Sequence, residues 1–240
     1  MDRSHRRRVA IVAVASVVAV TCIVLGFWQL ARLAERRDLN ARILDRRGGS
    51  PVSIEGTDGV ADEYRLVTVD GTYDAAHEVL VYGRSLESEA GHHVVTPLVL
   101  TDGDAVLVLR GWVPFAMQSA PIAGAAPPDG EVHVRGMLVP DEGDGSTMPD
   151  GAGVVRRLDV AGIASTLPYD VLPLPLQLTE QTPARSRDLP VPVPLPVLSE
   201  GPHLSYAIQW FSFAAVAAAG AMILLRRDRQ DPRSAFTGAP

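Results

Sequence analysis

The sequence lacks lysine altogether and contains a single cysteine, Cys22. One cysteine excludes an internal disulfide and a cysteine-based metal site. Cys22 lies inside an apolar run, which also excludes a cysteine nucleophile in a soluble domain. The formal net charge of −6 gives no reason to expect binding to nucleic acid.

Signatures of the common enzyme classes are missing as well. There is no Gly-rich phosphate loop after a strand, no His-Glu-x-x-His and no Gly-x-Ser-x-Gly. Carboxylates are scattered through loops such as "PDEGDG", where solvation explains them. The adjacent His92 and His93 are weak copper candidates, because neighbours on a strand point to opposite faces and no methionine or cysteine accompanies them. We therefore predict that the protein is not an enzyme.

Two long apolar runs are present. From Val9 to Leu30 there is no charge over about 22 residues, enough to cross roughly 30 Å of hydrocarbon. Trp28 suits the interfacial aromatic belt. The alternative is a cleaved signal peptide, since Arg6–Arg8 form a suitable basic start. The apolar run is too long for that, however, and no clean small-x-small site follows it.

The second run, Leu204 to Leu225, is also uncharged. Its alanine-rich half, Ala214 to Ala221, is compatible with a buried soluble helix, but the run's length and the arginines that follow favour a membrane span. Small residues there would allow another helix to pack closely. The aromatic residues cluster in its first half: Tyr206, Trp210, Phe211 and Phe213.

The arginines around the second run indicate an orientation. No basic residue lies between Asp188 and Leu225, and four follow: Arg226, Arg227, Arg229 and Arg233. The positive-inside rule then places this end in the cytoplasm, and two spans place the N-terminus there too. Arginines lie on both sides of the first span, so the second decides. We predict a cytoplasmic N-terminus (1–8), a span (9–30), an extracytoplasmic domain (31–203), a span (204–225) and a cytoplasmic tail (226–240).

The segment between the runs predicts a small antiparallel β-rich domain with one short helix. A helix should continue past residue 30 and stop at "GGSP" from Gly48. Strand patterns follow at 64–73, 79–82, around the Asp-Gly turn of residues 101–104, and at 131–140. Asp159 is a candidate N-cap of the short helix. The prolines of "YDVLPLPLQLTE" predict an edge strand. Residues 116–130, 141–153 and 183–202 should be linkers, the last a polyproline strut back to the membrane.

His203 lies at the outer mouth of the second span, with Tyr206 about one turn away. Ionisable residues at such a depth are candidate functional sites, and a neutral imidazole is a common axial ligand of haem iron. The alternative is a histidine that merely faces headgroups and water. Trp28 and Gln29 close the first span at a comparable depth. If the spans pack antiparallel, Trp28, Gln29 and His203 could face one pocket; alternatively, Trp28 is only a belt residue.

These residues resemble the surfeit locus protein one family of cytochrome c oxidase assembly factors, over most of the chain. "LGFWQLAR" is similar to a family pattern through Leu25, Gly26, Trp28, Gln29 and Arg32. "LRGWVP" is similar to a second signature through Arg110, Gly111, Trp112, Val113 and Pro114. "HLSYAIQWF" is similar to a third through His203, Tyr206, Ala207, Trp210 and Phe211. Leu109 and Pro202 depart from the asparagine that is common in the family at each place.

The resemblance implies a role in maturing subunit I of aa3-type haem–copper oxidases, with His203 as a ligand to the iron of haem a. Trp28, Gln29, Tyr206 and Trp210 would then contribute to the cofactor site. Expected partners are cytochrome c oxidase subunit I, the haem a synthesis machinery or a respiratory supercomplex, and the lipid bilayer. The all-arginine basic set indicates GC-rich codons and hence a bacterial plasma membrane. The alternative is a scaffold or accessory oxidase subunit that does not bind haem.

Overall fold

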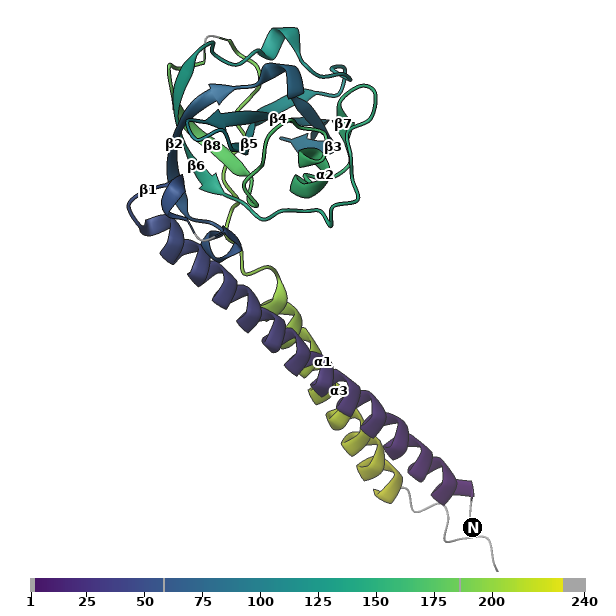
Figure 1. Ribbon diagram of the computed structural model, residues 1–240. Helices are drawn as coiled ribbons and strands as arrows, with labels where there is room; N and C mark the ends of the chain where they lie inside the picture. Colours follow the sequence, from purple (N-terminus) through teal and green to yellow (C-terminus); the bar gives the residue numbers. More distant parts are fainter. Residues whose placement is uncertain (1–2, 58, 186, 231–240) are drawn as a thin grey trace, which may run out of the picture. The chain divides into compact units, whose positions relative to one another are not determined.

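The computed structural model describes residues 3–57, 59–185 and 187–230 (Figure 1). The chain divides into two compact units, each considered by itself. One is formed by the chain up to Ala41 together with the chain from Leu198 onward, and the other by Arg42–Val197. Residues 231–240, which include Arg233 and most of the predicted cytoplasmic tail, lie outside the described residues.

Two long helices dominate the first unit. Helix α1 is Arg3–Gly48 and α3 is His203–Gln230. Both are long and apolar enough to cross a membrane, with mean hydropathies of 2.8 and 1.9 in their most apolar 18-residue windows. Only 11% and 6% of those windows are buried, so neither helix is the core helix of a soluble domain. The two helices are consistent with membrane association, and α1 ends at the predicted glycine pair.

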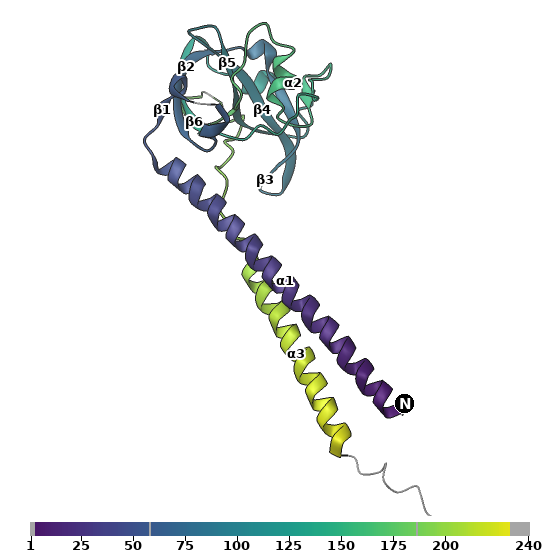
Figure 2. The same cartoon turned by 60° about the horizontal axis from the view of Figure 1, so that its bottom comes forward.

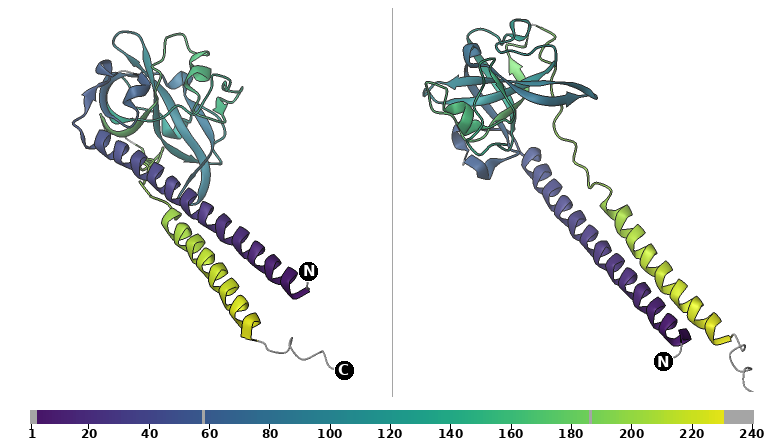
Figure 3. Two further views of the ribbon diagram at one scale, coloured as in Figure 1. Left: turned by 90° about the horizontal axis from the view of Figure 1, so that it is seen from below. Right: turned by 90° about the vertical axis from the view of Figure 1, so that its right-hand side faces the viewer.

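Helices α1 and α3 lie side by side and antiparallel within this unit (Figures 1 and 3). The seam between them places a small residue of one helix opposite an aromatic ring of the other, Gly26 of α1 against Phe211 of α3. At Gly26 a Cβ atom would lie 2.6 Å from Cε1 of Phe211, so a larger residue would have to displace that ring or separate the helices. The buried positions along the seam are Cys22, Gly26, Leu33, Ala207 and Ala214. Of the predicted small-residue face of α3, Ala214 to Ala221, only Ala214 is buried. Further along, Ala217, Gly220 and Ala221 line an apolar cavity of about 500 Å³ together with residues of α1.

The second unit is a β domain whose sheet closes into a barrel (Figure 2). In the described residues the strands run in the order β1-β2-β6-β8-β5-β4-β3-β7, and β2 also pairs with β4. The closed part therefore consists of β2, β6, β8, β5 and β4. The strand bounds are β1 Val52–Ser53, β2 Leu66–Tyr73, β3 Val79–Leu86, β4 Glu89–Leu100, β5 Ala105–Pro114, β6 Glu131–Leu138, β7 Val154–Val155 and β8 Leu176–Thr182.

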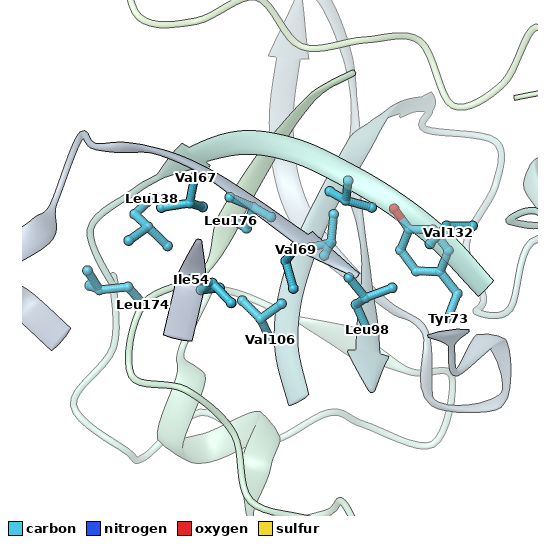
Figure 4. Packing of buried hydrophobic residues seen from close by; sticks show 12 residues of the cluster. Ile54, Val67, Val69, Tyr73, Leu98, Val106, Val132, Leu138, Leu174 and Leu176 are labelled. Carbon is cyan, nitrogen blue, oxygen red and sulfur yellow. The ribbon is translucent and has the colours of Figure 1, made fainter. Parts of the chain in front are cut away.

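The barrel interior is filled by alternate residues of these strands (Figure 4). In β2, Val67, Val69 and Tyr73 are buried, as expected for a strand with one face on a core. A second cluster on the β3–β4–β5 side contains Ile163 of the short helix α2 (Val160–Ala164). Burial of each large aliphatic side chain stabilises the fold by about 1.5–3 kcal/mol. The members labelled in Figure 4 are Ile54, Val67, Val69, Tyr73, Leu98, Val106, Val132, Leu138, Leu174 and Leu176.

The predicted fold class is confirmed: apolar helices lie at both ends of a β-rich domain that contains one short α-helix. The Asp-Gly turn of residues 101–104 joins β4 to β5. Asp159 caps α2 by accepting a hydrogen bond from the Gly162 N–H at 2.9 Å. The longer strand pairings are antiparallel, as predicted, but β1–β2, β3–β7 and β5–β8 are parallel over two residues each.

Two predictions about the last third of the β domain are wrong in part. The strand around residues 169–180 is not an edge, because β8 lies between β6 and β5. Its prolines, Pro173 and Pro175, precede the strand and therefore remove no ladder hydrogen bond. The expected strut of residues 183–202 is bound to the barrel in its middle: Val191 pairs with Trp112, and Gln177 donates to the Val193 carbonyl at 2.9 Å.

Candidate functional site

His203 is the first residue of α3 and is held by Gln29 of α1. Its Nδ1 lies 2.8 Å from the Gln29 amide oxygen. An amide oxygen can only accept, so Nδ1 is the donor, and in the neutral imidazole Nε2 then carries the lone pair. Histidines that bind metals commonly have this arrangement, in which the second ring nitrogen donates to a carbonyl or carboxylate group. Among the described residues Nε2 has no hydrogen-bond partner, so it is available to an electron-pair acceptor.

A cavity of about 360 Å³ opens beside His203. Its wall is one face of α1, and it is lined by Arg32, Glu35, Arg36, Leu39 and His203. Arg32 is paired with Glu35 at 2.7 Å, which neutralises both charges locally. Because α3 begins opposite Gln29, the turns of α1 beyond Gln29 extend past the first residue of α3.

The segment that leads into α3 is fixed to α1. The Arg37 guanidinium donates two hydrogen bonds to the Glu200 carboxylate, at 2.9 and 2.8 Å. This bidentate pair lies three residues before His203 and restricts where α3 can begin. Pro202 accepts the first helical hydrogen bond, from the Tyr206 N–H at 3.1 Å. The Pro202 carbonyl is therefore the first acceptor of the helix, and His203 follows it as the first residue of α3.

The aromatic residues predicted for the site lie on both helices: Tyr206 and Trp210 follow His203 on α3, and Trp28 precedes Gln29 on α1. Tyr206 follows one turn later and is 45% exposed. Trp210 is half-buried and makes an edge contact with Phe213, with ring centroids 5.9 Å apart. Trp28 is half exposed, and the Arg32 guanidinium lies 5.7 Å from its ring centroid. The structure thus joins Gln29 to His203, whereas Trp28 points away from the seam.

The signature at residues 110–114 belongs to the β domain and holds it together. Arg110 is 5% exposed and donates to Glu78 at 2.9 Å and to the Ala125 carbonyl at 2.8 Å. The other oxygen of Glu78 accepts from the Ile122 N–H at 2.9 Å. The buried pair therefore ties the 116–130 linker to the barrel. Glu78 was not predicted from the sequence, although a single acid beside the apolar run "VLVY" is a usable signal.

The next residues of the signature make close backbone contacts. Gly111 has a φ of 155°, and a Cβ there would lie 2.5 Å from the Val191 carbonyl oxygen. Trp112 donates from its indole N–H to the Arg84 carbonyl at 3.1 Å. Pro114 is the last residue of β5. These contacts join β5 to the 183–202 segment and to β3, which is a structural role.

His92 and His93 occupy different environments, as the strand geometry predicts. His92 is buried, and its ring stacks on Phe115 with centroids 5.1 Å apart. Burial and the nearby Arg84 lower the pKa of His93 to about 4. Within the described ranges there is no group of three or more histidine, cysteine, aspartate or glutamate side chains that could hold a metal ion.

Comparison with known proteins gives a consistent result over most of the chain. Residues 16–215 match the model of the "SURF1 family". A "SURF1-like protein" of Monosiga brevicollis is 31% identical over 227 residues, covering 88% of this chain and 85% of the relative. One of Rickettsia felis is 26% identical over 200 residues, covering 80% and 86%. An "uncharacterized SURF1-like protein" of Mycobacterium bovis is 28% identical over 218 residues, covering 85% and 79%. The matched region includes both sides of the His203–Gln29 contact.

Proposed function

This chain belongs to the SURF1 family, and we propose that it is an assembly factor for aa3-type haem–copper cytochrome c oxidase. It would assist delivery of haem a to subunit I, or stabilise that subunit while haem a is inserted. The proposal includes no enzymatic activity. The protein would bind its cargo and release it through a difference in affinity between two states.

The observation that carries this proposal is the hydrogen bond between His203 and Gln29. It fixes the imidazole ring and leaves Nε2 as the nitrogen with a lone pair. Neutral imidazole is a normal axial ligand of haem iron. A cavity adjoins the ring, and the apolar surfaces of Tyr206 and Trp210 follow it along α3. The residues present therefore fit a planar, largely apolar tetrapyrrole such as haem a, with His203 as the ligand of its iron.

The proposed setting is a bacterial plasma membrane with both termini in the cytoplasm. The arginines at residues 226, 227 and 229 favour a cytoplasmic end of α3, and His203 would then lie at the outer face. Exposed valines along α1, such as Val14, Val17 and Val20, would face lipid. The β domain would then lie outside the cytoplasm, available to the outer side of the oxidase or to the haem a synthesis machinery.

The test is the absorption spectrum of the purified full chain after co-expression with haem a synthesis enzymes. We expect a Soret band at near-stoichiometric haem in the wild type and its loss in His203→Ala. His133→Ala is the matched control, because the His133 side chain is exposed and, among the described residues, bonds only to Asp70 in the β domain. A wild type without haem, or an equal haem content in His203→Ala, would show that the ligand assignment is wrong.

A second candidate function is a scaffold or accessory subunit of the oxidase, or of a respiratory supercomplex, that does not bind haem. The exposed aromatic pair Tyr82 and Phe115, with centroids 5.7 Å apart on the β domain, favours it as a protein-contact surface. Co-purification of intact oxidase with a haem-free wild type, lost in Tyr82→Ser/Phe115→Ser, would select this function over the first.

A further inference from the structure

The cavity beside His203 is lined by a positively charged side chain, Arg36, for which the proposed iron ligand His203 gives no role. Arg36 is exposed and lines the cavity. It makes no hydrogen bond or ion pair with any described residue, whereas the neighbouring Arg32 is neutralised by Glu35 at 2.7 Å. The cavity therefore has one uncompensated positive charge.

The fold directs a second positive contribution to the same place. Helix α3 starts at His203, and the N–H groups of a helix's first turn have no acceptor within the helix. They form the positive end of the helix dipole. Because α1 and α3 are antiparallel, this end of α3 faces along α1 toward the turn that carries Arg36. The cavity thus combines a free guanidinium, a helix N-terminus and an imidazole.

We infer that this cavity binds a carboxylate group of the tetrapyrrole cargo, with Arg36 as its principal partner. The inference rests on the proposed function, since it names a second contact of that same cargo. Guanidinium binds carboxylate through two parallel hydrogen bonds. Arg36 lies on one side of His203 along the helices, and the apolar Tyr206 and Trp210 lie on the other. The polar edge of the cargo would be oriented toward Arg36 and its apolar edge toward the aromatic residues.

The shared chemistry is an anionic oxygen group on an amphipathic molecule, so a lipid phosphate is the other possible source. The probes are metal-free protoporphyrin IX and its dimethyl ester, titrated by fluorescence against the full chain in phosphatidylcholine nanodiscs. Without iron, these probes report carboxylate binding independently of the His203 ligand. We expect the free acid to bind roughly three- to tenfold more tightly than the ester, the range of a partly exposed Arg–carboxylate pair.

The variants separate the possible outcomes. Arg36→Gln should bring the ratio of acid affinity to ester affinity close to one, and Arg36→Lys should restore part of the difference. Arg226→Gln removes the same charge from the last turns of α3 and should leave the ratio unchanged. Glutamine is a good helix former, so the exposed Arg36 position should keep its fold, and circular dichroism checks this. His203→Ala should retain the ratio.

Equal binding of acid and ester by the wild type, or an unchanged ratio in Arg36→Gln, would overturn the inference. Phosphatidylglycerol nanodiscs provide the lipid arm: if Arg36→Gln changes only lipid retention and never the porphyrin ratio, the site binds lipid phosphate and the porphyrin assignment is wrong. If the wild type does not coordinate haem iron but still binds the acid more tightly than the ester, the assignment of His203 as iron ligand is wrong. The assignment of Arg36 as carboxylate site is then still supported.

Discussion

At the residue scale, the Arg110–Glu78 pair shows how a single buried ion pair organises the β domain. Both side chains are almost inaccessible to solvent, at 3% and 1% exposure. Removing one partner leaves the other charge buried without compensation, which typically costs about 3–5 kcal/mol. Arg110→Ala should therefore lower the free energy of unfolding by about that amount, measured as the shift of the denaturation midpoint of the full chain in detergent.

The control for this prediction is another arginine–glutamate pair of the same domain. Arg135 and Glu180 are 3.6 Å apart and exposed, so Arg135→Ala should cost less than about 1 kcal/mol. The double variant Arg110→Met/Glu78→Leu should recover part of the loss, because it leaves no unpaired buried charge. An Arg110→Ala protein as stable as Arg135→Ala would contradict the assigned role.

His203 is predictable from its position, whereas Arg110 is identified only through the family resemblance. Gln29 is predictable as a residue that could share a pocket with His203, but Glu78, the partner of Arg110, is not. A histidine behind a proline at the start of an apolar run is visible in the sequence. Arg36 is not visible in the same way, because α1 contains many arginines near its C-terminal end. The usable signal is spacing: Gln29, Arg32 and Arg36 are separated by three and four residues and therefore share one face of a helix. Which arginine remains unpaired depends on Glu35 and Glu200, and on where α3 begins.

At the element scale, the α1–α3 seam depends on one glycine. Because a Cβ at Gly26 would lie 2.6 Å from the Phe211 ring, Gly26→Ala must displace that ring or separate the helices. We expect a loss of about 1–3 kcal/mol, which is typical of overpacking, and weaker porphyrin binding because Gln29 lies one turn away. Thermal unfolding and the porphyrin titration measure the two effects. Gly220→Ala on α3 is the control, since nothing lies within 4 Å of its added Cβ; equal effects from both variants would refute the prediction.

Elements were predictable where the local pattern is strong. The uncharged runs predict the two long helices, and the glycine pair predicts where α1 ends. The Asp-Gly turn predicts the β4–β5 hairpin. Each of these signals acts within a few residues. The prolines near β8 wrongly predict an edge strand, because Pro173 and Pro175 lie just before the ladder begins and remove no hydrogen bond from it. A two-residue parallel pairing such as β5–β8 has no local signature.

At the scale of the whole molecule, barrel closure is the feature that local patterns could not reveal. It depends on β2 pairing with β4 at Gly71–Leu100, between strands that are also paired elsewhere. A Cβ at Gly71 would lie 2.5 Å from the Val99 carbonyl oxygen, so the glycine allows this close approach. The pairing covers the ends of β2 and β4 that β1 and β3 leave unpaired, so backbone groups there are not open to association with another strand.

The orientation of the whole chain gives the last prediction. If the arginines after α3 are cytoplasmic, the β domain faces outward and residue 5 faces inward. In a Cys22→Ser background, a membrane-impermeant maleimide should label Asp129→Cys, in an exposed loop of the β domain, on intact cells. His5→Cys should react only after lysis, and both sites should react equally in detergent, which controls for accessibility. Labelling of His5→Cys on intact cells, with Asp129→Cys protected, would invert the topology; His203 would then lie at the cytoplasmic face, and delivery of haem a would have to take place from that side.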